Sequence, residues 1–215
     1  MIDAFKEYFY ILIHPFDSQL RLREKILLSQ TKDIPSSLRY YEAIAISWIF
    51  SIIESLLTIF LIFISWHTLR HFPMPWSITS RAAPIGLLLV LIPPVLFPLT
   101  SYFYIQIWWL SFTFFIPLFT PYINHPPEGK MDGPTIKKIL DQTLISSFCP
   151  NALKLFPVFG NTLRNLASPF YIYAGLKESL GLPFWPSFII VLSPLFIAST
   201  FFLLVLLFVI LTFYH

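Results

Sequence analysis

This sequence has few charged residues and a single cysteine. Only 12% of its 215 residues are Asp, Glu, Lys or Arg, whereas soluble domains carry about 25%, and this excludes an ordinary water-soluble domain. The single cysteine, Cys149, excludes an intrachain disulfide and a cysteine metal cluster. The net charge is only +3, and no basic run is interleaved with aromatic residues, so nothing favours nucleic-acid binding.

Sequence patterns that would indicate catalysis are also scarce. The serines are scattered, and no Ser, His and Asp set shares a predicted membrane depth. His67 and His71 lie four residues apart without a nearby carboxylate, which is weak evidence for a metal site. The Gly-x-Ser-x-Gly and His-Glu-x-x-His motifs are missing. We therefore expect no catalytic residues, no metal, no cofactor and no enzymatic activity.

Apolar residues dominate instead. Hydrophobic residues make up 56% of the chain, mean hydropathy is +0.73, and there are 24 Phe and 19 Pro residues. This composition predicts an all-α integral membrane protein, because a helix of about 20 apolar residues crosses the hydrocarbon layer. Several spans should be kinked, since proline removes a backbone donor and clashes with the preceding turn. We expect five transmembrane helices, at 43–66, within 84–119, and at 139–155, 161–174 and 184–213.

The 84–119 stretch is too long for one simple span and contains Pro93, Pro94 and Pro98. It crosses the membrane either once or twice. A single crossing keeps the lysines of the following loop on the side that holds most basic residues, which the positive-inside tendency favours. We therefore prefer one crossing.

The region 1–41 is predicted to be cytoplasmic and to precede a membrane domain at 42–215. Six of the fourteen Lys and Arg residues come before the first span, which places the N-terminus in the cytoplasm. Apolar residues recur at helical spacing over 2–13, at Ile2, Phe5, Phe9 and Leu12 or Ile13. This amphipathic helix either lies in the headgroup plane or packs beneath the transmembrane bundle.

Four ionisable residues lie inside the predicted spans or at their ends: Glu54, Asp141, Lys154 and Arg164. An isolated charge in hydrocarbon is costly. We therefore expect Glu54 or Asp141 to face Arg164 or Lys154. Such a pair could lock the order of the helices or form part of a polar path for an ion or lipid headgroup. Alternatively, the two basic side chains extend to the membrane surface.

The stretch from Cys149-Pro150 to Leu182 contains several proline and glycine residues that are typical of turns and helix ends. Pro157 and Gly160 predict a turn, a span containing Tyr171 and Tyr173 follows, and Gly175 and Gly181 bracket Leu-Lys-Glu-Ser-Leu. This pattern resembles the last third of the Yip1 domain family, in its short bacterial form. The resemblance implies five spans, a cytoplasmic N-terminus and residence in a bacterial cytoplasmic (inner) membrane.

These features favour a non-enzymatic membrane scaffold or accessory subunit. Its expected partners are membrane lipids and other integral membrane proteins, within a larger complex. The alternative is a transporter or lipid-handling subunit that uses the polar third span, Glu54 and Arg164 as a midplane site. The sequence leaves open the partner, the oligomeric state, any bound substrate and the organism.

Overall fold

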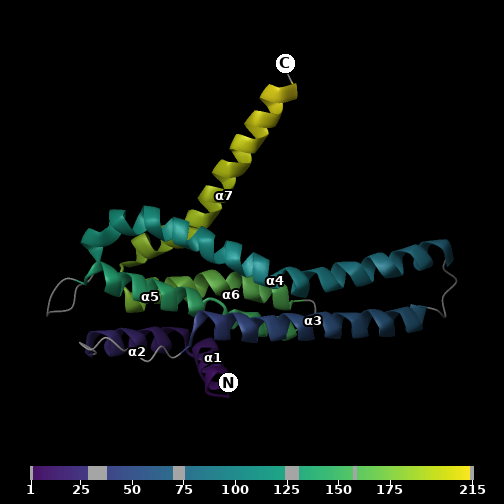
Figure 1. Ribbon diagram of the computed structural model, residues 1–215, viewed down its shortest axis with the longest axis horizontal. Helices are drawn as coiled ribbons and strands as arrows, with labels where there is room; N and C mark the ends of the chain where they lie inside the picture. Colours follow the sequence, from purple (N-terminus) through teal and green to yellow (C-terminus); the bar gives the residue numbers. More distant parts are fainter. Residues whose placement is uncertain (1, 29–37, 70–75, 124–130, 157–158, 214–215) are drawn as a thin grey trace. The chain divides into compact units, whose positions relative to one another are not determined.

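The computed structural model describes residues 2–28, 38–69, 76–123, 131–156 and 159–213, and all of its regular elements are helical (Figure 1). The all-α prediction is therefore confirmed. In chain order the elements are α1 (Ile2–Ile13), α2 (Pro15–Leu28), α3 (Tyr40–Leu69), α4 (Trp76–Phe119), η1 (Thr120–Tyr122), α5 (Gly133–Ser146), η2 (Cys149–Leu155), α6 (Gly160–Ala174), η3 (Gly175–Ser179) and α7 (Phe184–Phe213).

Three helices in the described part of the chain are long and apolar enough to cross a membrane. The candidate spans are Tyr40–Thr68 in α3, Val90–Tyr122 from α4 into η1, and Phe184–Thr212 in α7. At 1.5 Å per residue each exceeds the roughly 30 Å of hydrocarbon. They coincide with three of the five predicted spans. The 84–119 stretch lies within one continuous helix and contributes one candidate span, in agreement with the preferred single crossing.

The other two predicted spans differ from each other. α5 has only 14 residues, about 21 Å of helix, whereas α6 covers the whole predicted span 161–174 and continues into η3 as far as Ser179. After α5 the chain tightens into η2, a 3₁₀ helix that begins at Cys149 and Pro150, where proline has no N–H to continue the α-helical ladder. Three of the five predicted spans thus coincide with helices that are long and apolar enough to cross a membrane, and five spans are not confirmed.

The chain forms two compact units that are interleaved in sequence. The first unit contains residues 1–14, 35–102 and 145–168, and the second contains 15–34, 103–144 and 169–215. Both α4 and α6 contribute to each unit. The candidate site described below belongs entirely to the first unit.

A line of small residues on α3 organises the first unit. Ser47, Ser51 and Ser55 are spaced four apart, so they share one helix face, and all three are buried. Small side chains let neighbouring backbones approach closely. The Ser47 hydroxyl donates to the Phe148 carbonyl oxygen at 3.1 Å, and the Ser55 hydroxyl donates to the Val90 carbonyl oxygen at 3.0 Å. The α3 helix thereby holds both the segment before η2 and the first part of α4.

The amphipathic helix α1 packs through a face that the apolar periodicity did not select. Its buried residues are Ala4, Tyr8 and Ile11, whereas Ile2 and Ile13 are 74% and 66% exposed. Packing through Tyr8 lets its hydroxyl donate to the Phe148 carbonyl oxygen at 2.7 Å. The helix therefore packs against its own unit, and Phe9 of the predicted apolar set also meets the Phe50 ring edge to face at 6.0 Å. Placement in the headgroup plane or beneath a transmembrane bundle stays a prediction.

In the second unit, α2 packs against η3. The Ser179 hydroxyl hydrogen-bonds the backbone and side-chain oxygens of Gln19 at 2.8 and 2.7 Å, and the Phe16 and Phe170 rings meet edge to face at 5.2 Å. The α2 helix is part of the region 1–41 that was predicted to be cytoplasmic. The predicted link between Gly175 and Gly181 is a turn of π-helix that continues α6.

Candidate functional site

The structure brings together Glu54 and Lys154, two of the four predicted intramembrane ionisable residues. Glu54 lies on α3, fourteen residues from either end of the Tyr40–Thr68 span, and is therefore separated from each end by about 21 Å of helix. Lys154 lies in the last turn of η2. Its Nζ is 3.5 Å from Glu54 Oε2, and the two side chains are only 7% and 18% exposed. The ion pair is therefore largely shielded and lies near the middle of the span.

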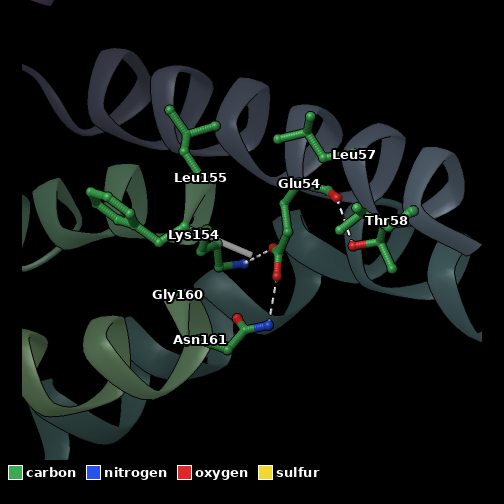
Figure 2. A pocket seen from close by; sticks show the side chains of 9 residues that line it. Glu54, Leu57, Thr58, Lys154, Leu155, Gly160 and Asn161 are labelled. Carbon is green, nitrogen blue, oxygen red and sulfur yellow. Dashed lines mark hydrogen bonds and ion pairs between the residues drawn. The ribbon is translucent and has the colours of Figure 1, made fainter. Parts of the chain in front are cut away.

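Two further groups complete the surroundings of this pair. The Asn161 amide Nδ2 donates to Glu54 Oε1 at 2.5 Å, so each carboxylate oxygen has a partner. The Lys154 ammonium also lies over the Phe97 ring, 5.4 Å from its centroid, where the negative ring face attracts a cation. Figure 2 shows the Lys154 and Asn161 side chains converging on Glu54 from η2 and α6. Sequence reasoning missed Asn161, although its place beside the predicted Gly160 turn was a signal.

A cavity of about 260 Å³ adjoins the pair. Its lining comes from α3, η2, the following residue and the start of α6: Glu54, Leu57, Thr58, Leu61, Lys154, Leu155, Phe156, Gly160 and Asn161. Polar groups occupy one part of this lining. The exposed side chains of Leu57, Leu61 and Phe156 form an apolar part. The cavity therefore combines a charged wall with an apolar border, as in sites for small amphipathic molecules.

Arg164 lies one turn beyond Asn161 on α6, and positions three apart share a helix face. Its Nη1 donates to the Asn165 Oδ1 at 3.1 Å, while its buried Nε has no hydrogen-bond partner among the described residues. Arg164 is thus a second cation on the α6 face that carries Asn161, although it is not among the residues that line the cavity.

Asp141 lies on α5, in the second unit, and the described contacts do not include it in this cluster. The balanced set of four charges expected from the sequence is therefore replaced, within the first unit, by three residues with a net charge of +1. The sequence had left four pairings open, and the structure selects the one between Glu54 and Lys154.

Of the predicted turn residues, Gly160 holds the polypeptide in place beside this cluster. A Cβ atom at Gly160 would lie 2.5 Å from the Leu153 carbonyl oxygen, so only glycine allows α6 to begin this close to η2. A Cβ at Gly175 would collide with the Thr143 side chain in the second unit. Gly181 has φ of 71°, a left-handed conformation that favours glycine. Pro157 lies outside the described residues.

The Phe148 carbonyl oxygen is a second polar point that sequence reasoning did not identify. Tyr8 Oη, Ser47 Oγ and Asn151 Nδ2 all donate to it, at 2.7, 3.1 and 2.8 Å. Because the α-helical pattern stops just before Pro150, the backbone donor of this carbonyl is the Asn151 N–H, at 3.0 Å. The three side chains supply further donors from within the protein, since an apolar body offers no others. This carbonyl thus ties α1 and α3 to the start of η2.

Metal ligation and thiol chemistry find little support among the described residues. Over the residues that the structure describes, no group of three or more His, Cys, Asp or Glu side chains is placed to hold a metal ion. Cys149, the single thiol, is fully buried and forms no disulfide. The arrangement at Glu54, Lys154 and Asn161 is thus one that can bind and orient a polar group.

No protein-family model, curated protein or solved structure matches this chain.

Proposed function

We propose that this protein is a non-enzymatic membrane scaffold or accessory subunit that packs against another integral membrane protein. The observation that carries the proposal is α7. None of its most apolar 18-residue window is buried, and from Leu195 to Thr212 every side chain is exposed except that of Ile197, which is half-buried. An apolar surface of this kind belongs in lipid or against a partner.

The residue composition of α7 favours contact with a helix of a partner protein. Ala198, Ser199 and Thr200 interrupt a run of Phe, Leu, Val and Ile residues with three small side chains. Helices in lipid gain no hydrophobic energy from meeting, and they associate instead where small residues permit close backbone packing. The fold uses α7 only up to Ser193, the last buried residue of the helix. The exposed remainder is thus available to a partner.

Replacing residues 195–212 with leucine tests this role while retaining a membrane span. We expect the leucine variant to insert and to keep its thermal stability, but to lose the membrane protein that co-purifies with the natural chain in mild detergent. The paired substitutions Phe60→Leu and Phe63→Leu on the exposed face of α3 are the control. An unchanged partner in the leucine variant would reject α7 as the docking element. The absence of a reproducible partner for the natural chain would reject the proposed function.

We further propose that all five apolar segments enter a bacterial cytoplasmic membrane, with the N-terminus inside, as the resemblance to the Yip1 domain family implies. Three segments cross fully. The other two form a re-entrant hairpin made of α5 with η2 and of α6. In this arrangement both ends of the hairpin lie on the cytoplasmic side, where the positive-inside tendency places Lys137, Lys138 and Lys177.

The register within the first unit supports the hairpin. The Phe148 carbonyl meets Ser47, and seven residues further along α3 the Lys154 ammonium meets Glu54, so this arm advances along α3 toward the middle of its span. The chain then reverses, and Ser168 on α6 donates to the Ser147 carbonyl oxygen at 3.2 Å. The turn is therefore at the level of Glu54, about halfway along α3.

Cysteine labelling distinguishes this hairpin from two complete spans. A cysteine replacing the exposed Phe159 near the turn should resist a membrane-impermeant maleimide added outside intact cells. A cysteine replacing Thr68 at the far end of the α3 span should react. Equal labelling at the two positions would establish complete crossings and reject the hairpin.

A second candidate function is lipid handling or transport, and the cavity at Glu54 and Lys154 favours it. Interrupted helices that place charges and a helix start near the membrane midplane are characteristic of transporter sites. The accessory role and this activity are compatible, because the cavity and the exposed part of α7 use different residues. Flux or lipid movement across vesicles that contain the purified chain would support the second candidate, and it should fall when Arg164 is neutralised.

A further inference from the structure

The cavity at the turn between η2 and α6 has cationic groups that the protein does not fully satisfy. The Lys154 ammonium has three N–H donors and is only 7% exposed. Among the described residues its one anionic partner is Glu54, at 3.5 Å, which is longer than the 2.7 to 2.9 Å of a strong charge-assisted hydrogen bond. The ammonium can therefore donate a hydrogen bond to a further anionic oxygen.

Arg164 adds a second cation that has no carboxylate of its own. Its described hydrogen bond goes to the neutral Asn165, and its Nε is buried without a partner. Counted with Glu54 and Lys154, it leaves this set of three residues with one positive charge in excess. Uncompensated charge in an apolar body is costly unless it is paired. An anion that entered the cluster would remove this cost.

The first turn of α6 also favours the binding of an anion. Gly160 and Asn161 begin this helix and line the cavity, and the N-terminal end of a helix carries a partial positive charge that attracts anions. Lys154 and the helix start thus face one small space, and Arg164 lies one turn further along α6. Leu57, Leu61 and Phe156 provide the exposed apolar border of this space.

We propose that this cavity binds the anionic headgroup of an acyl-chain lipid, with its charged oxygens on Lys154 and Arg164 and its chain along Leu57, Leu61 and Phe156. The inference deepens the lipid-handling candidate and rests on it. A volume of about 260 Å³ is slightly below the 300 to 1,000 Å³ that encloses a drug-sized ligand. It thus accommodates a headgroup while the chain remains outside the cavity, in hydrocarbon.

Glu54 competes with the ligand in this arrangement, since it holds the ammonium that the lipid anion would contact. Neutralising Glu54 should therefore strengthen lipid binding, while neutralising either cation should weaken it. If the ion pair were only structural, neutralising Glu54 and neutralising a cation would not change lipid affinity in opposite directions. The same anionic oxygens occur in a fatty-acid carboxylate and in a phospholipid phosphate, so binding experiments must include both.

Native mass spectrometry of the full chain in detergent, titrated with oleic acid, dioleoyl phosphatidylglycerol or dioleoyl phosphatidylcholine, tests the proposal. We expect one anionic lipid per chain, bound at least tenfold more tightly than phosphatidylcholine. Binding should weaken about tenfold in Arg164→Gln and strengthen severalfold in Glu54→Gln. Lys177→Gln, which removes a half-exposed lysine of the second unit, is the matched control and should bind as the natural chain does.

Arg164→Gln keeps the test decisive if Lys154→Gln fails to fold, because the described contacts give Arg164 no ion-pair partner in the protein. Preference for oleic acid would assign a carboxylate ligand, and preference for phosphatidylglycerol would assign a phosphate ligand. Equal binding of all three lipids, or unchanged binding in Arg164→Gln, would overturn the proposal. Loss of lipid selectivity in a chain that still moves lipid across vesicles would reject this site alone, whereas binding without any lipid movement would reject the lipid-handling function.

Discussion

Breaking the ion pair between Glu54 and Lys154 should reveal how the first unit is held together. Glu54→Gln leaves the Lys154 ammonium, which is 7% exposed, beside Arg164 with no anion in the cluster. Removing one partner of a buried pair costs about 3 to 5 kcal/mol. A change of 1 kcal/mol shifts the melting temperature of a chain of this size by roughly 2 to 4 °C, so the melting temperature should fall by roughly 6 to 20 °C.

The reverse substitution should be milder. Lys154→Met removes the ammonium but leaves Arg164 as a second cation in the cluster near Glu54. The double variant Glu54→Gln with Lys154→Met contains neither charge of the pair, and replacing both members of a buried pair is often close to neutral. We therefore expect the double variant to recover most of the stability that Glu54→Gln loses, with a coupling energy of about 2 kcal/mol or more.

Cys149 provides the assay. It is the single cysteine of the sequence and is fully buried, so a thiol-reactive fluorogenic dye reports its exposure as the protein unfolds in detergent. Arg164→Gln is the control, because the described contacts give Arg164 no carboxylate to lose, and it should be at least as stable as the natural chain. If Glu54→Gln melts at the natural temperature, or if the two single changes simply add in the double variant, the pair does not stabilise the fold.

Three further predictions follow from other contacts. Gly175→Ala should destabilise the second unit by about 1 to 3 kcal/mol through overpacking against Thr143, and adding Thr143→Ala should recover part of the loss in the same dye assay; no recovery would contradict the contact. Tyr8→Phe should cost about 1 kcal/mol by removing a donor to the Phe148 carbonyl, whereas Tyr122→Phe, at an exposed side chain, should not, and equal melting of the two variants would reject this role. Asp132 accepts a hydrogen bond from the Thr135 backbone N–H at 3.2 Å, and hydrogen bonding from Thr135 lowers its pKa below the ordinary 3.8. Its stabilising contribution is therefore present above that value and is lost as the pH falls through the lowered pKa, which carboxylate NMR titration can follow; a pKa at or above 3.8 would contradict it.

The long helices could be predicted from the sequence because lipid thickness sets a minimum length. The apolar stretches at 43–66, 84–119 and 184–213 reach that length, and each becomes a single helix. The interruption after α5 was also visible, since Pro150 cannot continue an α-helical ladder. What hydropathy could not show is that α5 ends at Ser146 before the 3₁₀ helix η2, whereas α6 continues into η3.

Charge pairing was predictable as a class but not as a particular contact. The sequence allowed Glu54 or Asp141 to meet Lys154 or Arg164, because the cost of an isolated buried charge does not depend on which partner removes it. The choice of Lys154 depends on the register of η2 along α3, which the serines of α3 and the Phe148 carbonyl set through contacts distant in sequence. The role of Asn161 depends on the same register.

The helix α1 shows the same division between local and tertiary information. Periodicity alone determined that residues 2–13 form an amphipathic helix, since the spacing of apolar residues is a local property. Only the tertiary structure decided that Tyr8, and not the most apolar face, packs inward, because a buried carbonyl elsewhere in the chain needed its hydroxyl. The composition of this protein thus determined that it forms long apolar helices, while the burial of a few polar groups decided how those helices meet.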